Sequence, residues 1–374
     1  MNITVIDLFC GAGGLTAGFT DHRVNQGFGF QPILALDNNR DACKTYNANF
    51  PGDHCIAANI EDWLKDKPYI PKADLIIGGP PCQGFSLLNK QRSGDVRRDL
   101  WEPYMDIVQT SDARLFIMEN VPGILKGQEF IDITTRAKQL GFTLFSAVLN
   151  MADYGIPQTR KRAIIIGAKD KIITQRLASN FPPPKTHRAP NTPGTLPIWR
   201  TVKEVIYNLE PPKGVEMRNT PTPYDLHFGR TPTEMSLARY KAVPTGGNRF
   251  DLMKNAPEIT PKCWLNKPSG STDLFGRLWW DRPSVTIRTE FFKPEKGRYL
   301  HPEQHRPITH REAARIMTFP DKFVFHGNKI EIAKQIGNAV PPDFARYIAS
   351  YIYRILASTN KSVGKITETD VCIT

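Results

Sequence analysis

The sequence predicts an α/β protein in which a doubly wound sheet domain is joined to a second, smaller and irregular domain. Three observations support this. Short apolar runs alternate with amphipathic stretches in the first half, glycines follow the first apolar run, and a proline-rich region interrupts the pattern. The 374 residues also exceed the size of a typical single core, which agrees with a division into two domains.

The expected strands are short, apolar and rich in β-branched residues. They occupy residues 3–8, 32–36, 75–77, 115–118, 143–149 and 163–167. Helical composition and length are found between them, at residues 40–49, 102–110 and 129–140. In such a sheet, ligands bind beyond the carboxyl ends of the strands, so the residues that follow each strand are the candidates for a site.

The second domain is expected where the composition changes, after about residue 181. Residues 211–300 contain 11 prolines and 11 aromatic residues, with 15 basic and 9 acidic residues. Proline cannot continue a helix or a central strand, so this region should be irregular. Thr309 and Glu312 then form a capping-box pattern, which predicts that regular structure resumes.

Charge and cysteine content limit the functional classes. The net charge is +12 and the sequence pI is about 9.4, which favours a polyanionic partner without identifying it. The six cysteines include no Cys-x-x-Cys pair, so we expect neither a metal site nor disulfides, and we expect reduced thiols in the cytoplasm. No apolar run approaches the ~18 residues of a membrane span, and the N-terminus resembles a core strand rather than a signal peptide.

A glycine-rich turn follows the first strand, in residues 7–14 (DLFCGAGG). Its glycines would let the backbone approach a ligand, although a plain tight turn is an equal alternative. The spacing is not Gly-x-Gly-x-x-Gly, which favours a nucleoside-type ligand over a phosphate. Asp37 ends the second strand, where it could accept hydrogen bonds from a ribose diol.

Cys82 follows Gly78-Gly79-Pro80-Pro81 at the end of another strand. A lone cysteine is usually a buried structural residue. Here two prolines fix the backbone and stiffen the loop, which favours a presented thiol. A thiolate suits addition to an electron-poor ring carbon when nearby cations raise its population.

Two further motifs are expected at the same edge of the sheet. Glu119 directly follows the predicted strand at residues 115–118, where it could protonate a ring nitrogen or simply cap a helix. Gln158, Arg160 and Arg162 alternate immediately before the strand at residues 163–167 and could point into one site. A solvated face or phosphate contacts would explain the same cations.

In this order, the motifs resemble those of the cytosine-5 DNA methyltransferase family, bacterial restriction-modification type. The matching segments are residues 7–14, 78–86, 119–121, 158–162 and 335–342. The resemblance implies a Rossmann-like methyltransferase domain formed by residues 1–205 and 301–374. It also implies a target-recognition domain at residues 206–300, in which Trp264, Trp279, Trp280, Arg277 and Arg282 are candidates for core packing or contacts.

The resemblance implies a reaction as well. Cys82 would attack C6 of a flipped cytosine, Glu119 would engage N3 and the exocyclic amine, and Arg160 and Arg162 would stabilise the base. Methyl transfer from S-adenosylmethionine to C5 would leave S-adenosylhomocysteine, without a metal. Residues 86–100 resemble the family's mobile loop, with Lys90, Arg92, Arg97 and Arg98 as phosphate contacts.

A set of cofactor-binding residues is also implied. They are Phe9, Gly11, Ala12, Gly13, Gly14, Leu15, Asp37, Asn38, Asn59, Ile60, Pro80, Leu100, Asn338, Ala339 and Val340. At Asn59 the family usually has Asp, so the bond to the adenine amino group is in doubt there, although an amide oxygen can still accept a hydrogen bond.

The implied partner is a specific sequence in double-stranded DNA, with a monomeric enzyme and a cognate restriction endonuclease that would act independently. One alternative is a tRNA cytosine-5 methyltransferase, against which the large recognition segment argues. Another is a catalytically silent DNA-binding regulator, which would not need Cys82. A nicotinamide-dependent dehydrogenase would need the dinucleotide glycine fingerprint that the turn lacks.

Overall fold

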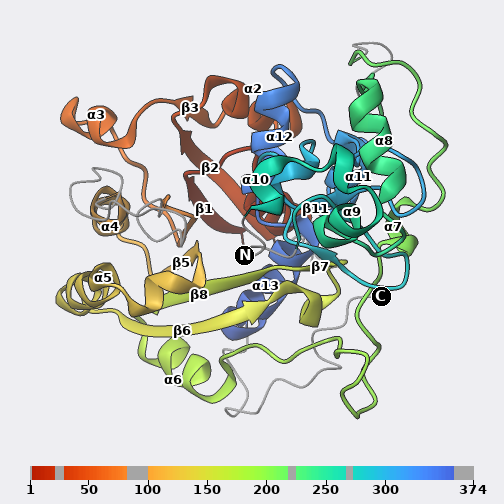
Figure 1. Cartoon of the computed structure of the whole chain (residues 1–374). Helices are drawn as coiled ribbons and strands as arrows, with labels where there is room; N and C mark the ends of the chain where they lie inside the picture. The colour runs from red at the N-terminus through yellow and green to blue at the C-terminus, as the bar shows by residue number, and fades with distance from the viewer. Residues whose placement is uncertain (1, 22–28, 82–99, 218–224, 267–272, 358–374) are drawn as a thin grey trace. The chain divides into compact units, whose positions relative to one another are not determined.

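The structure is a computed structural model that describes residues 2–21, 29–81, 100–217, 225–266 and 273–357 (Figure 1). The chain divides into two compact units, and each is described by itself. Unit 1 consists of Met1–Gly155, Arg160–Pro197 and Val340–Thr374. Unit 2 consists of Ile156–Thr159 and Ile198–Ala339. The functional division at residues 206 and 301 remains a prediction.

Unit 1 is built on a seven-stranded sheet with the strand order β3-β2-β1-β4-β5-β8-β6. The strands are β1 (Asn2–Leu8), β2 (Gly29–Asp37), β3 (Cys55–Ala57), β4 (Leu75–Gly78), β5 (Leu115–Asn120), β6 (Thr143–Asn150) and β8 (Lys161–Ala168). Strands β1 to β5 are mutually parallel, whereas β8 runs antiparallel to both β5 and β6. The predicted α/β class is confirmed, and all six predicted strands are present.

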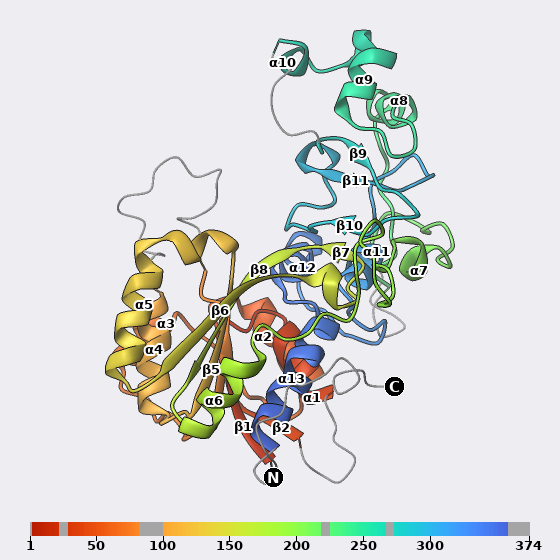
Figure 2. The same cartoon turned by 90° about the horizontal axis from the view of Figure 1, so that it is seen from below.

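Helices cover both faces of this sheet. They are α1 (Gly14–Asp21), α2 (Arg40–Asn49), α3 (Ile60–Lys65), α4 (Trp101–Thr110), α5 (Gln128–Gln139), α6 (Lys171–Asn180) and α13 (Pro342–Ala357). In Figure 2, α3, α4 and α5 lie on one face, and α1, α6 and α13 lie on the other. The helical connections from β1 to β5 each carry the chain back to the same end of the sheet, so these parallel strands finish at a common edge.

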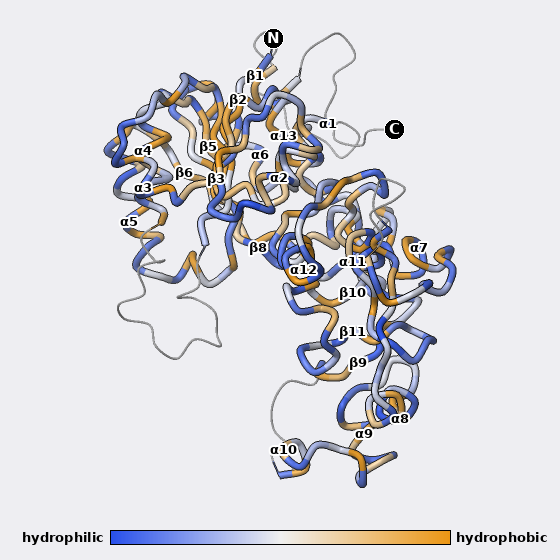
Figure 3. Tube along the Cα trace, turned by 90° about the horizontal axis from the view of Figure 1, so that it is seen from above, coloured by the Kyte–Doolittle hydropathy of each residue, from blue (hydrophilic) through white to orange (hydrophobic). Residues whose placement is uncertain are grey.

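The alternation of side chains along β1 explains the two layers. Ile6 and Leu8 join a buried cluster with Tyr104, Met105 and Val108 of α4. Each fully buried aliphatic side chain contributes ~1.5–3 kcal/mol. Figure 3 shows the same segregation as hydrophobic colour along the strands of the sheet. Asp7 points to the opposite face, where Thr16 of α1 donates to its carboxylate at 2.6 Å.

The other face of the sheet is closed by α13, which packs closely on α1. A Cβ atom at Gly18 would lie 2.2 Å from the amide nitrogen of Arg346 and 2.4 Å from the carbonyl oxygen of Pro342. Only glycine therefore allows this approach of the two helices. At the other end, Arg176 of α6 donates to the carbonyl of Ile355 at 2.7 Å, which caps α13.

Unit 2 has short elements joined by long loops, as its proline content predicted. Its helices are α7 (Lys203–Ile206), α8 (Glu234–Ala242), α9 (Arg249–Asn255), α10 (Lys262–Leu265), α11 (His310–Ile316) and α12 (Lys329–Asn338). Its strands form two parallel pairs, β7 (Gln158–Thr159) with β10 (Ser284–Val285) and β9 (Gly276–Arg277) with β11 (Arg298–Leu300). Side-chain hydrogen bonds must therefore stabilise much of the loop structure of unit 2.

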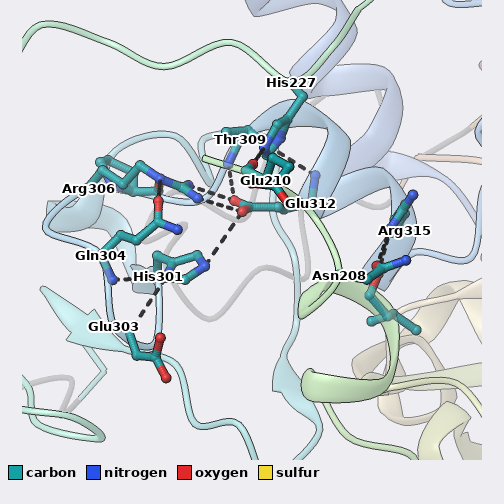
Figure 4. A network of polar contacts seen from close by, with 12 residues as sticks. Asn208, Glu210, His227, His301, Glu303, Gln304, Arg306, Thr309, Glu312 and Arg315 are labelled. Atoms are coloured by element: carbon teal, nitrogen blue, oxygen red, sulfur yellow. Dashed lines mark hydrogen bonds and ion pairs between the residues drawn. The ribbon is translucent and has the colours of Figure 1, made fainter. Parts of the chain in front are cut away.

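A buried polar network around Glu312 holds part of unit 2 together (Figure 4). Glu312 is 1% exposed and accepts two hydrogen bonds from Arg306, at 2.8 and 2.7 Å. It also accepts the Thr309 amide at 2.7 Å, which completes the predicted capping box of α11. His227 bonds the Thr309 hydroxyl at 2.9 Å. Charge-assisted bonds from Arg306 and a further bond from His227 thus tie two irregular segments to the start of α11.

Arg277 is a second structural centre of unit 2. Its guanidinium is 2% exposed and donates to four backbone carbonyls, those of Tyr240, Val243, His301 and Gln304, at 2.6 to 3.1 Å. Loops without regular pairing leave such acceptors unsatisfied, and one buried arginine satisfies several of them. Of the two roles considered for Arg277, the structure supports core packing. Trp264 likewise packs against Phe275 in a buried cluster.

Candidate active site

The candidate active-site residues of unit 1 lie along one edge of its sheet. Strands β1, β2, β4 and β5 end there because they are parallel. Strand β8 begins there because it is antiparallel, and its Ala163 pairs with Asn120 at the end of β5. The glycine turn, Asp37, Pro80, Glu119 and Arg162 therefore meet at a common edge. Cys82 lies outside the described residues.

The glycine turn after β1 is tied to the end of β2. The amide of Gly11 donates to Asp37 Oδ2 at 2.8 Å, and the amide of Asn39 donates to Oδ1 at 2.8 Å. Phe9, Gly11 and Gly13 all have positive φ angles, of 56°, 53° and 84°. A Cβ atom at Gly11 would meet no atom within 4 Å, so the turn borders open space. This backbone can approach a ligand closely.

Asp37 keeps acceptor capacity despite its two backbone bonds, since each carboxylate oxygen has a second lone pair. Burial raises the pKa of this carboxyl, and the amide hydrogen bonds from Asn39 and Gly11 oppose that effect. The predicted contact with a ribose diol is compatible with this geometry and stays a prediction. Asn38, beside it, is exposed.

Asp7 is a buried carboxyl beneath the glycine turn, and the sequence alone suggested no role for it. It is 0% exposed, and among the described residues its Oδ1 has no hydrogen-bond partner. Burial raises its pKa to about 7, against the opposing hydrogen bond from Thr16. The one signal in the sequence was an acidic residue at an inward position of a strongly apolar strand.

Glu119 and Arg162 form the central pair of the site. Arg162 Nε lies 2.9 Å from Glu119 Oε1, and their side chains are only 17% and 11% exposed. A guanidinium in a partly buried position stabilises a carboxylate more strongly than at the surface. The sequence placed both residues at one edge of the sheet, and the structure brings them into contact.

Arg160 and Gln158 were expected to point into the site together with Arg162. Arg160 belongs to unit 1 and is buried, at 2% exposure. The expectation for Gln158 is wrong, because its side chain lies in the interior of unit 2. Its Oε1 accepts the Ile287 amide at 2.9 Å, and its Nε2 lies 2.9 Å from Met317 Sδ. The cause is the pairing of β7 with β10, which separates Gln158 from β8.

Asn120 is a residue that the sequence analysis missed. It is 4% exposed, and its Nδ2 donates to the carbonyl of Pro80 at 3.0 Å. Its Oδ1 accepts the amide of Val121 at 2.8 Å. Asn120 thus links the end of β5 to the proline segment that precedes Cys82. A possible signal was its position directly after Glu119, opposite two prolines that offer no amide donors.

The remaining predicted cofactor residues divide between the units. Ile60 is buried in the main cluster of unit 1, and Leu100 packs against the same cluster. Asn59 is exposed and caps α3, since its Oδ1 accepts the amides of Glu61 and Asp62 at 2.9 and 3.3 Å. Its carbonyl oxygen would therefore have to be shared with an adenine amino group.

Three more predicted cofactor residues lie around the end of α12. Asn338 and Ala339 belong to unit 2, and Val340 belongs to unit 1, where it is 7% exposed. Asn338, the last residue of α12, is exposed. Their predicted role at a cofactor stays a prediction.

The described ranges show no group of three or more His, Cys, Asp or Glu side chains arranged to hold a metal ion. They also contain no helix that is long and apolar enough to cross a membrane. Both statements concern these ranges only.

Comparison with known proteins decides the family. The model of the C-5 cytosine-specific DNA methylases matches residues 3–354. The chain belongs to this family. It is therefore a DNA (cytosine-5) methyltransferase, as the motif order predicted, and the match includes Cys82, Glu119 and Arg162.

Curated relatives of this methylase match it over most of its length. The type II methyltransferase M1.HphI of Haemophilus parahaemolyticus is 34% identical over 366 residues, which cover 95% of this chain and 88% of that protein. The type II methyltransferase M.NgoFVII of Neisseria gonorrhoeae is 31% identical over 366 residues and covers 96% and 88%.

Solved structures agree with the fold of the methylase. A prophage-encoded DNA modification methyltransferase of E. coli matches with a TM-score of 0.67 and 25% identity, over 95% of this chain and 99% of that one. The Dnmt2 methyltransferase of S. pombe matches with a TM-score of 0.56 at 14% identity, over 96% and 100%. The second likeness concerns the fold alone.

Proposed function

We propose that this methylase modifies C5 of a flipped cytosine in a specific duplex sequence through a covalent bond between Cys82 and C6 of the base. The observation that supports this most is the contact of Glu119 with Arg162 at 2.9 Å. An acid and a cation at that edge suit a pyrimidine whose N3 and carbonyl oxygen gain negative charge. Pro80, two residues before Cys82, is tied to the same strand end.

The residues divide the work as follows. The Cys82 thiolate forms a bond to C6, and the displaced electron pair moves into the ring toward C5 and N3. Glu119 donates a proton or hydrogen bond at N3 and holds the exocyclic amine, while Arg162 and Arg160 stabilise the added negative charge. After C5 has accepted the methyl group, it loses its proton to a base such as solvent water, and the N3 proton returns to Glu119. The electrons of that C–H bond re-form the C5–C6 double bond and expel the thiolate, which restores Cys82.

The residues near the glycine turn fit S-adenosylmethionine, which supplies an electrophilic methyl group when it is bound. Asp37 ends β2 with free acceptor capacity, as a ribose diol requires. The open side of Gly11 leaves room for the ligand beside the backbone. Phe9 and Ile60 add apolar surface suited to an adenine ring. No bond from Asn59 is needed in this arrangement.

The base must leave the helix to reach such a site, since the ring atoms are stacked within a duplex. We assign sequence recognition to residues 206–300 of unit 2 and catalysis to residues 1–205 and 301–374. The basic residues of the chain would supply phosphate contacts and thus much of the DNA affinity. The predicted closing loop comprises residues 86–100, and all of it except Leu100 lies outside the described ranges.

The biological setting that we propose is restriction modification, in the cytoplasm, with a monomeric enzyme. Its curated relatives are named type II methyltransferases. An endonuclease of the same specificity would then act independently on unmethylated DNA. Sequencing the methylated cytosines of cells that express the protein would identify the recognition sequence, and cleavage of that sequence by a co-expressed nuclease would test the pairing.

The experiment that tests the proposed function measures methyl transfer from labelled S-adenosylmethionine to duplex DNA and to tRNA in parallel. Wild type should label DNA at cytosine C5, and Cys82→Ala should lose this activity while it retains DNA binding. Label confined to tRNA would overturn the substrate. Turnover by Cys82→Ala would place the nucleophile elsewhere, whereas DNA binding without any turnover by wild type would favour a regulator.

A further inference from the structure

The side chain of Asn120 is fixed on both sides. Its Nδ2 donates to the Pro80 carbonyl at 3.0 Å, and its Oδ1 accepts the Val121 amide at 2.8 Å. The opposite orientation of the amide would place oxygen against a carbonyl and nitrogen against an N–H group. Both bonds therefore specify a single orientation, and at 4% exposure water cannot easily replace either one.

Proline chemistry makes this bond important for the segment after β4. Pro80 and Pro81 have no backbone N–H groups, so neither residue can donate a hydrogen bond. The segment can be tied down there only through its carbonyl oxygens. Pro80 itself is buried, and Asn120 supplies the donor for its carbonyl. The side chain of Asn120 thus anchors the segment through a carbonyl oxygen, the one backbone hydrogen-bonding group that proline retains.

A second contact joins the same two strand ends. The backbone at Gly79 lies against Glu119, since a Cβ atom there would be 3.3 Å from Glu119 Oε2 and 3.4 Å from the Glu119 carbonyl oxygen. Just before this point, Gly78 pairs with Met118 in the sheet. Consecutive residues of β5 therefore contact consecutive residues of the proline segment, Glu119 with Gly79 and Asn120 with Pro80.

We propose that Asn120 is a positioning residue, which holds Pro80, two residues before Cys82 in the sequence, in register with the Glu119 carboxylate. This inference rests on the proposed function, in which Cys82 and Glu119 act on one base. The nucleophile then follows Pro80 by two residues on a frame anchored to the strand that carries the acid. Displacement of reacting groups by about 1 Å can cost ~10²-fold in rate, so one buried bond matters here.

A purely structural asparagine would make a different prediction. Its loss would lower stability throughout unit 1 but leave the rate per folded molecule unchanged. Tyr104→Phe provides a matched control, because Tyr104 is 0% exposed and its hydroxyl donates to the Ile117 carbonyl of the same strand at 3.0 Å. That bond ends on Ile117, three residues before Asn120, and not on the carbonyl of Pro80.

The test compares the wild-type enzyme with Asn120→Asp, Asn120→Ala and Tyr104→Phe on duplex DNA that contains 5-fluorocytosine. We expect both Asn120 variants to form the covalent adduct about 10-fold to 100-fold more slowly in single-turnover experiments, with DNA and cofactor affinities within about 3-fold of wild type. Tyr104→Phe should lower the thermal midpoint similarly but slow the adduct less than about 3-fold. Asn120→Ala breaks the same bonds without the buried negative charge that Asn120→Asp can introduce, so agreement between the two variants excludes an effect of charge.

Amide hydrogen exchange of the peptide at residues 78–86 provides a readout that is independent of chemistry. Exchange should accelerate in both Asn120 variants and stay near the wild-type rate in Tyr104→Phe. Normal exchange and a normal adduct rate in Asn120→Ala would overturn the positioning role. Failure of wild type itself to form any adduct, with exchange altered as expected, would instead refute the proposed reaction and show that Asn120 only anchors the segment structurally.

Discussion

Arg162 Nε lies 2.9 Å from Glu119 Oε1, and the two residues come from neighbouring strands that run in opposite directions. Because β8 is antiparallel, its first residues stand beside the last residues of β5. A cation from the start of one strand thereby meets an acid from the end of another, beside the Pro80 segment.

Replacement of Arg162 tests this pair. Arg162→Lys keeps the positive charge but lacks the planar donor geometry, so we expect kcat to fall by about 10²-fold to 10³-fold with little change in cofactor affinity. Single-turnover methylation and equilibrium binding measure the two effects. Lys161→Ala, at the exposed neighbouring residue, is the control. Equal kcat values for wild type and Arg162→Lys would remove Arg162 from the chemistry.

Asp7 should make unit 1 less stable as the pH rises. Its pKa is about 7 in the folded protein and near 3.8 when unfolded, so between these values only the folded state holds the proton. Stability contributed by Asp7 is then lost from pH 4 to 7. We expect Asp7→Asn to show a flatter dependence of unfolding free energy on pH, as measured by denaturant titration. A slope identical to that of wild type would contradict the assignment.

His310 should have the opposite effect in unit 2. Burial among Phe228, Phe291 and Phe292 lowers its pKa from 6.5 to about 4, so the unfolded state binds the proton more readily. The contribution of neutral His310 to the free energy of unfolding of unit 2 is present above pH 6.5 and is lost as the pH falls toward 4. His310→Asn should weaken this dependence, and the part that remains is expected from His301, whose pKa burial also lowers to about 4. Hydrogen exchange of unit 2 peptides between pH 4.5 and 7 separates this effect from that of Asp7.

Gly18 tests the packing of α13 on α1. A methyl group there would lie 2.2 to 2.5 Å from atoms of Arg346, Pro342 and Ala345, two of them backbone atoms, so the helices must separate. We expect Gly18→Ala to destabilise unit 1 by about 1–3 kcal/mol in chemical denaturation. Gly229→Ala, whose nearest neighbour would be 3.4 Å away, should change stability much less. Comparable losses in both variants would argue against the close approach.

Replacement of Arg277 and replacement of Arg282, both in unit 2, should have different effects. Arg277 serves four buried carbonyls, so Arg277→Met should unfold unit 2 at lower temperature. Arg282 is exposed over the ring of Trp279, at 5.1 Å. Arg282→Met should leave the thermal midpoint unchanged but weaken DNA binding and reduce its salt dependence by about one ion. Calorimetry measures the thermal midpoints, and binding titrations at several salt concentrations measure the DNA contacts. A lowered midpoint in Arg282→Met with an unchanged midpoint in Arg277→Met would contradict these assignments.

Local sequence patterns were sufficient to predict the frame of the site. Apolar runs identified β2, β4 and β5, at or just beyond whose ends Asp37, Pro80 and Glu119 lie, and helix α2 was predicted with its observed bounds. Strand β3 was missed because its three residues are too few to show alternation, and two of them are exposed. The carboxyl-edge rule then placed the acid near the proline segment without any knowledge of distances.

Long-range contacts limited the rest of the prediction. Gln158 was assigned to the site because it alternates with Arg160 and Arg162, but two residues of pairing with β10 direct it elsewhere. No local sequence pattern predicts the pairing of β7 with β10. Asn120 was missed for the same reason, since its partner Pro80 is distant in sequence and only the fold brings them together. Arg277 could not be assigned to core or surface until its carbonyl partners were known.

Mass spectrometry of a trapped enzyme–DNA complex tests whether Cys82 bonds covalently to the target cytosine. Duplex DNA with 5-fluorocytosine at the methylated position is incubated with the enzyme and S-adenosylmethionine, and the product is digested and mapped by mass spectrometry. Fluorine cannot leave C5 as a proton does, so we expect a stable adduct on the peptide that contains Cys82, absent in Cys82→Ala. Methylation of normal DNA without a trapped complex, or an adduct on another residue, would contradict it.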